Sequence, residues 1–144
     1  MTDRIKLQGM TFYAFHGVGE DERRKGQVFS IDVEVRGDFA RAGRSDRLED
    51  TVDYSQLFRE IQAVVEGPPH NLLESLAEEV ASRLLSRDNV TEVQVEVRKP
   101  HVHMRNAVLE YAGVRIERTR SGQSSGGIDD ERGRTDSRSI DRSR

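Results

Sequence analysis

Residues 70–85 read HNLLESLAEEVASRLL, a stretch whose pattern indicates a core-forming helix. Its apolar side chains recur every three or four positions, the spacing of one face of an α-helix. They are Leu72, Leu73, Leu76, Ala77, Val80, Leu84 and Leu85. The pattern predicts an amphipathic helix that packs this face against a core.

Glu74 lies one turn into this helix, beside the apolar stripe, and two roles are open for it. Asn71 is a favoured N-cap residue, and a glutamate three positions later can accept a hydrogen bond from the backbone N–H of the cap. The same carboxylate can instead hold a ligand. Capping boxes are common and ligand-anchoring acids are rare, so the helix taken alone favours the cap.

The rest of the first 120 residues adds a second helix and four strands. Residues 54–67 have helical spacing and end at Gly67-Pro68-Pro69, with Asp53 or Ser55 as the candidate cap. Strand patterns cover residues 4–15, 28–39, 92–99 and 107–118, with loops at 16–27 and 40–53. The order β-β-α-α-β-β predicts an α+β fold, a four-stranded antiparallel sheet with both helices on one face. The other face stays uncovered, and domains of this kind often hide such a face or their sheet edges by oligomerising.

Composition separates residues 1–120, the expected domain, from residues 121–144. The second segment has two aliphatic residues, five acids and five arginines, and predicts a disordered, low-complexity tail. Residues 1–120 carry 18 basic and 21 acidic side chains, which provides no electrostatic field for nucleic acid or an anionic membrane. No signal peptide or membrane span is apparent, and no cysteine is present for disulfides or thiol catalysis. These features indicate a cytoplasmic enzyme or binding module.

Four polar residues stand out in this framework. Lys99 continues the apolar face of Val93, Val95 and Val97, so we expect its side chain to be partly desolvated. Partial desolvation favours the neutral amine and suits proton transfer. A lysine at a strand end whose ammonium group reaches water gives the same pattern. Tyr54 opens a helix, where packing is the usual role, and Glu22 lies in an acid-rich loop as a solvated charge. His16 ends a strand, where a structural hydrogen bond is expected.

His101 and His103 could both face a metal ion, because alternate residues of an extended segment share a face. Without cysteine, a third ligand would have to be a carboxylate, His16 or His70, so we predict no metal site. No glycine-rich loop of the P-loop or dinucleotide type is present.

Several blocks in order resemble one family. FYAFHGVGEDERRKGQVFSIDVEV, TVDYSQLF, NLLESLAEEVASRL and VEVRKP are similar to the signature blocks of dihydroneopterin aldolase, with the intervening lengths kept. The resemblance covers nearly all of residues 4–118. It implies the tunnelling fold, in which sheets of several subunits join into a ring-shaped barrel, with tetramers or octamers and active sites between subunits.

The resemblance also implies a reaction and its residues. 7,8-Dihydroneopterin would be split by a retro-aldol step into 6-hydroxymethyl-7,8-dihydropterin and glycolaldehyde, in folate biosynthesis. Glu74 and the backbone of Leu73 would anchor the pterin. Lys99 would be the principal acid–base residue, Tyr54 would line the site and share in proton transfer, and Glu22 would hold the hydroxylated side chain through water. The imine of the dihydropterin ring is already an electron sink, so no cofactor, metal or lysine Schiff base is expected.

Alternatives remain open on the residues alone. A paralogous 2'-epimerase acting on dihydroneopterin or its triphosphate can keep the same acid, tyrosine and lysine, although the HGV and NLLE blocks favour the aldolase. A side oxygenase activity is a further option in this family, and a zinc-dependent pterin synthase of the same fold lacks matching ligands here. A non-catalytic pterin-binding oligomer is the alternative of another class. After Lys99-Pro100 many family members carry a further proline-containing turn, which this chain replaces with HVHMRNAVLEYAG.

Overall fold

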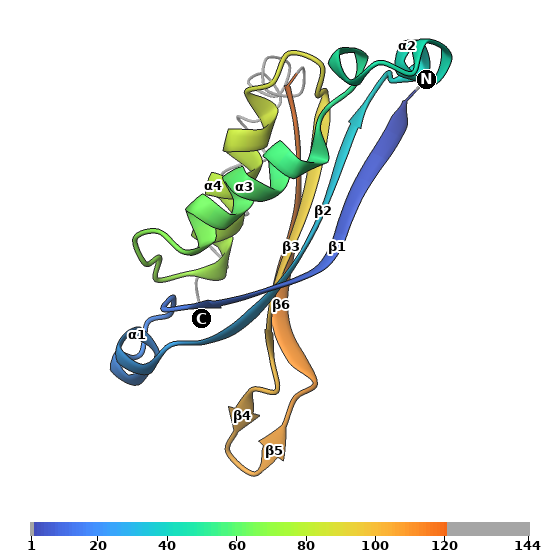
Figure 1. Ribbon diagram of the computed structural model, residues 1–144. Coiled ribbons are helices and arrows are strands. Elements are labelled where there is room, and N and C mark those ends of the chain that lie inside the picture. Colours follow the sequence, from blue (N-terminus) through green and yellow to red (C-terminus); the bar gives the residue numbers. More distant parts are fainter. Residues whose placement is uncertain (1, 121–144) are drawn as a thin grey trace, which may run out of the picture.

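The computed structural model describes residues 2–120, in which a four-stranded sheet and two longer helices form two layers (Figure 1). The sheet order is β1-β2-β3-β6, and all neighbouring strands are antiparallel. The strands are β1 (Asp3–Ala14), β2 (Gln27–Gly37), β3 (Glu92–Pro100) and β6 (Tyr111–Thr119). Helices α3 (Tyr54–Val65) and α4 (Leu73–Leu85) cover one face, which confirms the predicted α+β architecture. The predicted tail, residues 121–144, lies outside the described residues.

The core forms between this sheet face and the two helices. In β2 and β3 every second residue is buried, and Ile31, Val33 and Val35 pair across the strands with Val97, Val95 and Val93. The helices contribute their own apolar stripes, whose buried members are Leu57, Ile61, Val64, Val65, Leu76, Ala77, Val80, Ala81 and Leu84. The opposite sheet face carries polar and charged side chains. Within residues 2–120, no helix is long and apolar enough to cross a membrane.

A β-bulge bends the first strand. The pairing of β1 with β2 shifts register between Leu7 and Met10, and Gly9 within this shift has a φ of 72°. That left-handed conformation favours glycine. The Gly9 N–H donates to Asp32 Oδ1 at 2.6 Å, so the backbone group that leaves the ladder still has a partner. Beyond the bulge, β1 runs across the lower end of the sheet toward helix α1 (Figure 1).

Five short elements depart from the predicted pattern. The loop at 16–27 contains helix α1 (Glu20–Lys25), and the connection at 40–53 contains α2 (Ala40–Ser45) and the 3₁₀ turn η1 (Leu48–Asp50). The last strand begins later than predicted, because β4 (His103–Met104) and β5 (Ala107–Val108) form a separate hairpin. Each element spans six residues or fewer, too short for a repeating apolar pattern to reveal it.

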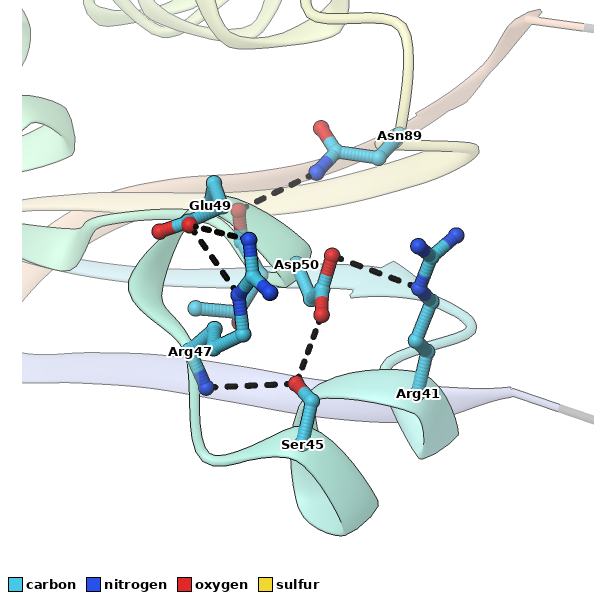
Figure 2. A network of polar contacts seen from close by, with 7 residues as sticks. Arg41, Ser45, Arg47, Glu49, Asp50 and Asn89 are labelled. Atoms are coloured by element: carbon cyan, nitrogen blue, oxygen red, sulfur yellow. Dashed lines mark hydrogen bonds and ion pairs between the residues drawn. The ribbon is translucent and has the colours of Figure 1, made fainter.

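Polar contacts order the connection that leads into α3 (Figure 2). Asp50 accepts a hydrogen bond from Ser45 Oγ at 2.6 Å and pairs with Arg41 at 3.4 Å. Asn89, in the turn before β3, donates to the carbonyl of Thr51 at 3.3 Å. These contacts fix the chain just before the first residue of α3.

One predicted helix cap is confirmed and the other is wrong. The Asp53 side chain caps α3 by accepting a hydrogen bond from the Ser55 N–H at 2.9 Å. Helix α4 instead begins after Leu72, without a side-chain cap, and Asn71 Oδ1 accepts a hydrogen bond from Arg23 at 2.6 Å. The capping box of Asn71 and Glu74 therefore does not form, because Asn71 is engaged with another element.

The Asp53 cap gives a stability prediction. Asp53→Ala should lower the free energy of unfolding by about 1 kcal/mol, because a first-turn N–H of α3 loses its acceptor. Ser55→Ala is the matched control, since it keeps the backbone N–H that makes this bond. Urea unfolding followed by circular dichroism measures both variants, and an equal cost in the two would contradict the capping role.

Candidate active site

An ion pair joins two residues that are distant in the sequence. Lys99 Nζ lies 2.6 Å from Glu22 Oε2, and the two side chains are 17% and 30% exposed. Lys99 continues the inward-facing row of β3 after Val97, so its predicted partial desolvation is confirmed. The reading of Glu22 as a solvated surface charge is wrong, since α1 turns its carboxylate toward the end of β3.

Glu22 accepts two further hydrogen bonds. The Gly19 N–H donates to Oε1 at 3.0 Å, and Gln27 Nε2 donates to Oε2 at 3.2 Å. Burial by itself raises the pKa of Glu22, but the bonds from Lys99, Gly19 and Gln27 together outweigh it and hold the pKa below the ordinary value. Glu22 is therefore a carboxylate at neutral pH. Its contribution to stability is present above the ordinary pKa of glutamate and is lost as pH falls through the lower folded value.

Gly17 makes room for this carboxylate. Its φ is 144°, and a Cβ at this position would lie 2.2 Å from Glu22 Oε1. A side chain of any kind would therefore both strain the backbone and displace the carboxylate.

His16, the residue before Gly17, is fully buried and binds backbone groups through both ring nitrogens. Nε2 lies 2.7 Å from the carbonyl of Val65, and the His70 N–H donates to Nδ1 at 2.9 Å. Because Nδ1 accepts a hydrogen bond, the ring is neutral and carries its proton on Nε2. The predicted structural role of His16 is confirmed.

Burial lowers the pKa of His16, the Val65 carbonyl offsets this in part, and the charges of His70, Arg23 and Lys99 lower the pKa further. The unfolded chain therefore binds this proton more tightly than the folded one. It follows that this site makes the fold less stable as pH falls below the ordinary histidine value of 6.5.

The loop that carries Glu22 is bonded to the residues just before α4. The Gly17 N–H donates to the carbonyl of His70 at 2.9 Å, and Arg23 donates to Asn71 at 2.6 Å. Figure 1 shows α1, the first turn of α4 and the last part of β3 at the same end of the molecule.

Glu74 is the second residue of α4, and its side chain is exposed. Within residues 2–120 it makes no hydrogen bond or ion pair, so its two oxygens are available to a ligand. The N–H of Leu73 belongs to the first turn of the helix, where backbone donors have no partner within the helix.

Tyr54 lies apart from these residues. It is the first residue of α3, whereas Val65, which contacts His16, is the last. A helix of this length spans about 18 Å. Tyr54 is 61% exposed and borders an apolar groove with Leu7 and Phe58, so it is not packed into the core of its own chain. The structure thus brings Glu22 and Lys99 together near the start of α4 and leaves Tyr54 at the far end of α3.

The residues considered for a metal site do not converge in the described part of the chain. Among residues 2–120, no group of three or more histidine, cysteine, aspartate or glutamate side chains is placed to hold a metal ion. His70 is engaged by Ser75 Oγ at 2.6 Å and by Glu79 Oε1 at 2.8 Å.

Comparison with known proteins gives a consistent result. The family model described as "FolB: Dihydroneopterin aldolase" matches residues 5–117. The chain belongs to the dihydroneopterin aldolase family. Dihydroneopterin aldolase 1 of Arabidopsis thaliana is 40% identical over 123 residues, which cover 85% of this chain and 84% of the relative.

Two solved members of the family were crystallised with ligands. E. coli dihydroneopterin aldolase in complex with neopterin has a TM-score of 0.72 and 32% identity, over 81% of this chain and 98% of that one. Dihydroneopterin aldolase from Burkholderia thailendensis, bound to guanine, has a TM-score of 0.69 and 26% identity. The match covers 83% of this chain and 92% of that one.

Several features of the candidate site could not be found from the sequence. Gly17, Arg23 and Asn71 were not singled out as site residues, and the two hydrogen bonds of the buried His16 ring join elements that are distant in the sequence. The only local signal is the His16-Gly17 dipeptide at the end of a strand.

The close approach of the Glu22 carboxylate to Gly17 gives a second prediction. Gly17→Ala should lower the free energy of unfolding by about 1–3 kcal/mol, because the new Cβ strains the backbone and displaces the Glu22 carboxylate from its ion pair with Lys99. Gly43→Ala is the control, since a Cβ there meets nothing within 4 Å. It should be neutral or slightly stabilising in helix α2. A Gly17→Ala protein as stable as the Gly43→Ala control would show that Glu22 does not need the space left by Gly17.

Proposed function

We propose that this protein cleaves 7,8-dihydroneopterin into 6-hydroxymethyl-7,8-dihydropterin and glycolaldehyde. The observation that carries the proposal is the Lys99–Glu22 pair, in a chain of the dihydroneopterin aldolase family. The loop that holds Glu22 is bonded to the residues just before α4, where Glu74 has no partner within residues 2–120. The three residues come from β3, α1 and α4, and each has a distinct task in the reaction.

Glu74 and Leu73 anchor the pterin ring in this proposal. The E. coli relative was crystallised with neopterin and the Burkholderia relative with guanine, and both ligands carry the same 2-amino-4-oxopyrimidine edge. Two N–H groups of that edge donate to the Glu74 carboxylate in a parallel pair, and the Leu73 N–H donates to the ring. The exposed carboxylate at the start of α4, which has no partner within residues 2–120, supports this role.

Lys99 moves the protons of the reaction. A proton leaves the 2'-hydroxyl of the substrate as the bond between C1' and C2' breaks, which releases glycolaldehyde. The bonding electrons pass into the ring imine and give an enamine, and C1' then takes up a proton to become the hydroxymethyl group. A positioned, partly desolvated lysine suits both transfers, and atoms and charge balance without an added reactant.

Glu22 orients the hydroxylated side chain and Lys99. Its carboxylate stays ionised because of the bonds from Lys99, Gly19 and Gln27, so it acts as an acceptor and not as a proton source at neutral pH. One oxygen faces Lys99, which keeps the ammonium at a fixed position relative to the bound side chain.

Tyr54 completes the site from a neighbouring copy. Within one chain, the length of α3 separates Tyr54 from Val65, which binds His16. Gly17, the residue after His16, packs against Glu22 of the ion pair. An arrangement of subunits that brings Tyr54 of one copy to Lys99 of another removes this separation. We therefore propose a homo-oligomeric ring of four or eight subunits with active sites between copies.

Anaerobic incubation of the purified protein with 7,8-dihydroneopterin and a chelator tests the activity. Chromatography should show 6-hydroxymethyl-7,8-dihydropterin and glycolaldehyde in equal amounts. Formation of the isomeric dihydromonapterin alone would replace the aldolase by the epimerase, and an unchanged substrate would favour a non-catalytic pterin binder.

Variants of Lys99 and Glu74 should fail in different ways. Lys99→Ala should keep pterin binding and lose kcat by about 10²–10⁴, since proton transfer is lost. Glu74→Ala should weaken pterin binding by about 100-fold or more, because the ring donors lose a charged acceptor. Fluorescence titration and steady-state kinetics separate the two effects, with Lys6→Ala and Glu78→Ala as controls. Normal pterin affinity in Glu74→Ala would exclude the anchor role.

Mixed oligomers test the shared site. Tyr54→Ala and Lys99→Ala should each be inactive alone, yet co-assembled in equal amounts they should regain about one quarter of wild-type activity, because some sites combine two intact residues from two copies. Activity is measured after joint refolding, with separately refolded and then mixed proteins as the control. If the joint sample stayed inactive, Tyr54 and Lys99 would belong to sites within one chain.

A further inference from the structure

The loop that carries Glu22 and the helix end that carries Glu74 meet at a buried junction. His16 binds the last residue of α3 through Nε2 and the backbone of His70 through Nδ1. The Gly17 N–H returns a bond to the carbonyl of His70. One peptide segment before α4 is therefore held on both its N–H and its C=O by two consecutive residues.

The junction continues into the first turns of α4. The ring of His70 contacts Ser75 Oγ at 2.6 Å and Glu79 Oε1 at 2.8 Å. His16 thus connects through the His70 backbone and ring to the helix whose first two residues are Leu73 and Glu74. In the other direction it is followed by Gly17, against which the Glu22 carboxylate packs.

We propose that His16 is a positioning residue for the reaction. It sets the distance and orientation between the Lys99–Glu22 pair and the ring anchor at Leu73 and Glu74. This inference rests on the proposed function and adds to it a residue that does not touch the substrate.

Three observations support a positioning role over simple core filling. The ring is 1% exposed and lies edge-on to Phe29 at 5.3 Å, a place that an apolar side chain could fill. Both of its nitrogens are used, one as donor and one as acceptor, and both partners are backbone atoms at element ends. The bonds join the end of β1 to α3 and to the start of α4, the elements whose relative placement fixes the candidate site.

The hydrogen bond from the His70 N–H to Nδ1 requires the neutral form of His16, and burial and the surrounding charges favour the same form. His70 in the α3–α4 connection, Arg23 in α1 and Lys99 in β3 surround the ring. All three disfavour a positive charge on His16. Glu22 and Glu79 are paired with Lys99 and His70 respectively. Protonation of Nδ1 would place a hydrogen against the His70 N–H and break that bond.

The experiment compares His16→Ala and His16→Gln with Val35→Ala. Glutamine keeps one donor and one acceptor and does not titrate. Val35→Ala opens a cavity in the core at the opposite end of β2 and provides a control that is destabilised without touching the junction. Each variant is assayed for kcat on 7,8-dihydroneopterin, for binding of guanine as a ring probe, for the midpoint of urea unfolding and for the pH dependence of kcat.

His16→Ala should lose kcat about 10–100-fold while guanine binding changes little, because a small misplacement of reacting groups is enough for such a loss. His16→Gln should recover most of kcat at pH 7.5, and its kcat should fall less than that of the wild type on acidification. Val35→Ala, matched in unfolding midpoint, should keep a wild-type kcat. Equal kcat values in His16→Ala and Val35→Ala would overturn the proposal, as would a kcat in His16→Gln as low as in His16→Ala.

Asn71→Ala provides a second route if His16→Ala does not fold. Asn71 is exposed, and the change removes the bond from Arg23 that also ties α1 to the α4 connection. It should lower kcat several-fold with guanine binding retained, and an unchanged kcat would count against positioning at this junction. Wild-type protein that fails to turn over dihydroneopterin would instead overturn the proposed function, which keeps the two failures distinct.

Discussion

The architecture of the candidate site depends on the hydrogen bonds between the end of β1 and the connection from α3 to α4. His16 joins the carbonyl of Val65 to the N–H of His70, and Gly17 bonds the carbonyl of the same His70. Buried backbone groups require partners, so a connection that ran differently would leave these groups unpaired. The two-layer core brings the elements to one end of the molecule, and this junction decides their final placement.

The charges at that end fit the proposed binding of a ligand better than a purely stabilising role. Lys99 and Glu22 form a partly buried pair, and a pair of this kind gains little net stability because both ions lose water. Glu22 receives two more hydrogen bonds, whereas Glu74 has no partner within residues 2–120. The Glu22 carboxylate is therefore fixed, which fits its proposed role of orienting Lys99. The Glu74 carboxylate has no partner in the described residues, which fits its proposed role of binding a neutral ring through N–H donors.

The regular elements could be predicted from the sequence because their patterns are long. The alternation of Val93, Val95 and Val97 and the spacing of the apolar residues of α4 each report one buried face. Helix α1 and the β4–β5 hairpin were missed because they are short and bury no apolar face. The cap at Asn71 was wrong because its oxygen binds Arg23, 48 positions away in the chain. Spacing cannot pair Glu22 with Lys99, which are 77 positions apart, and only the resemblance to the family placed both in one site.

The proposed assembly into a ring would account both for the charged sheet face that residues 2–120 leave uncovered and for the remote position of Tyr54. The most direct measurement is a crystal structure of the oligomer with neopterin bound. The account predicts the pterin edge within about 3 Å of the Glu74 carboxylate, the hydroxylated side chain at Lys99 and Glu22, and Tyr54 of a neighbouring copy against the same ligand. A pterin bound away from Glu74, or a site completed by Tyr54 of the same chain, would contradict it.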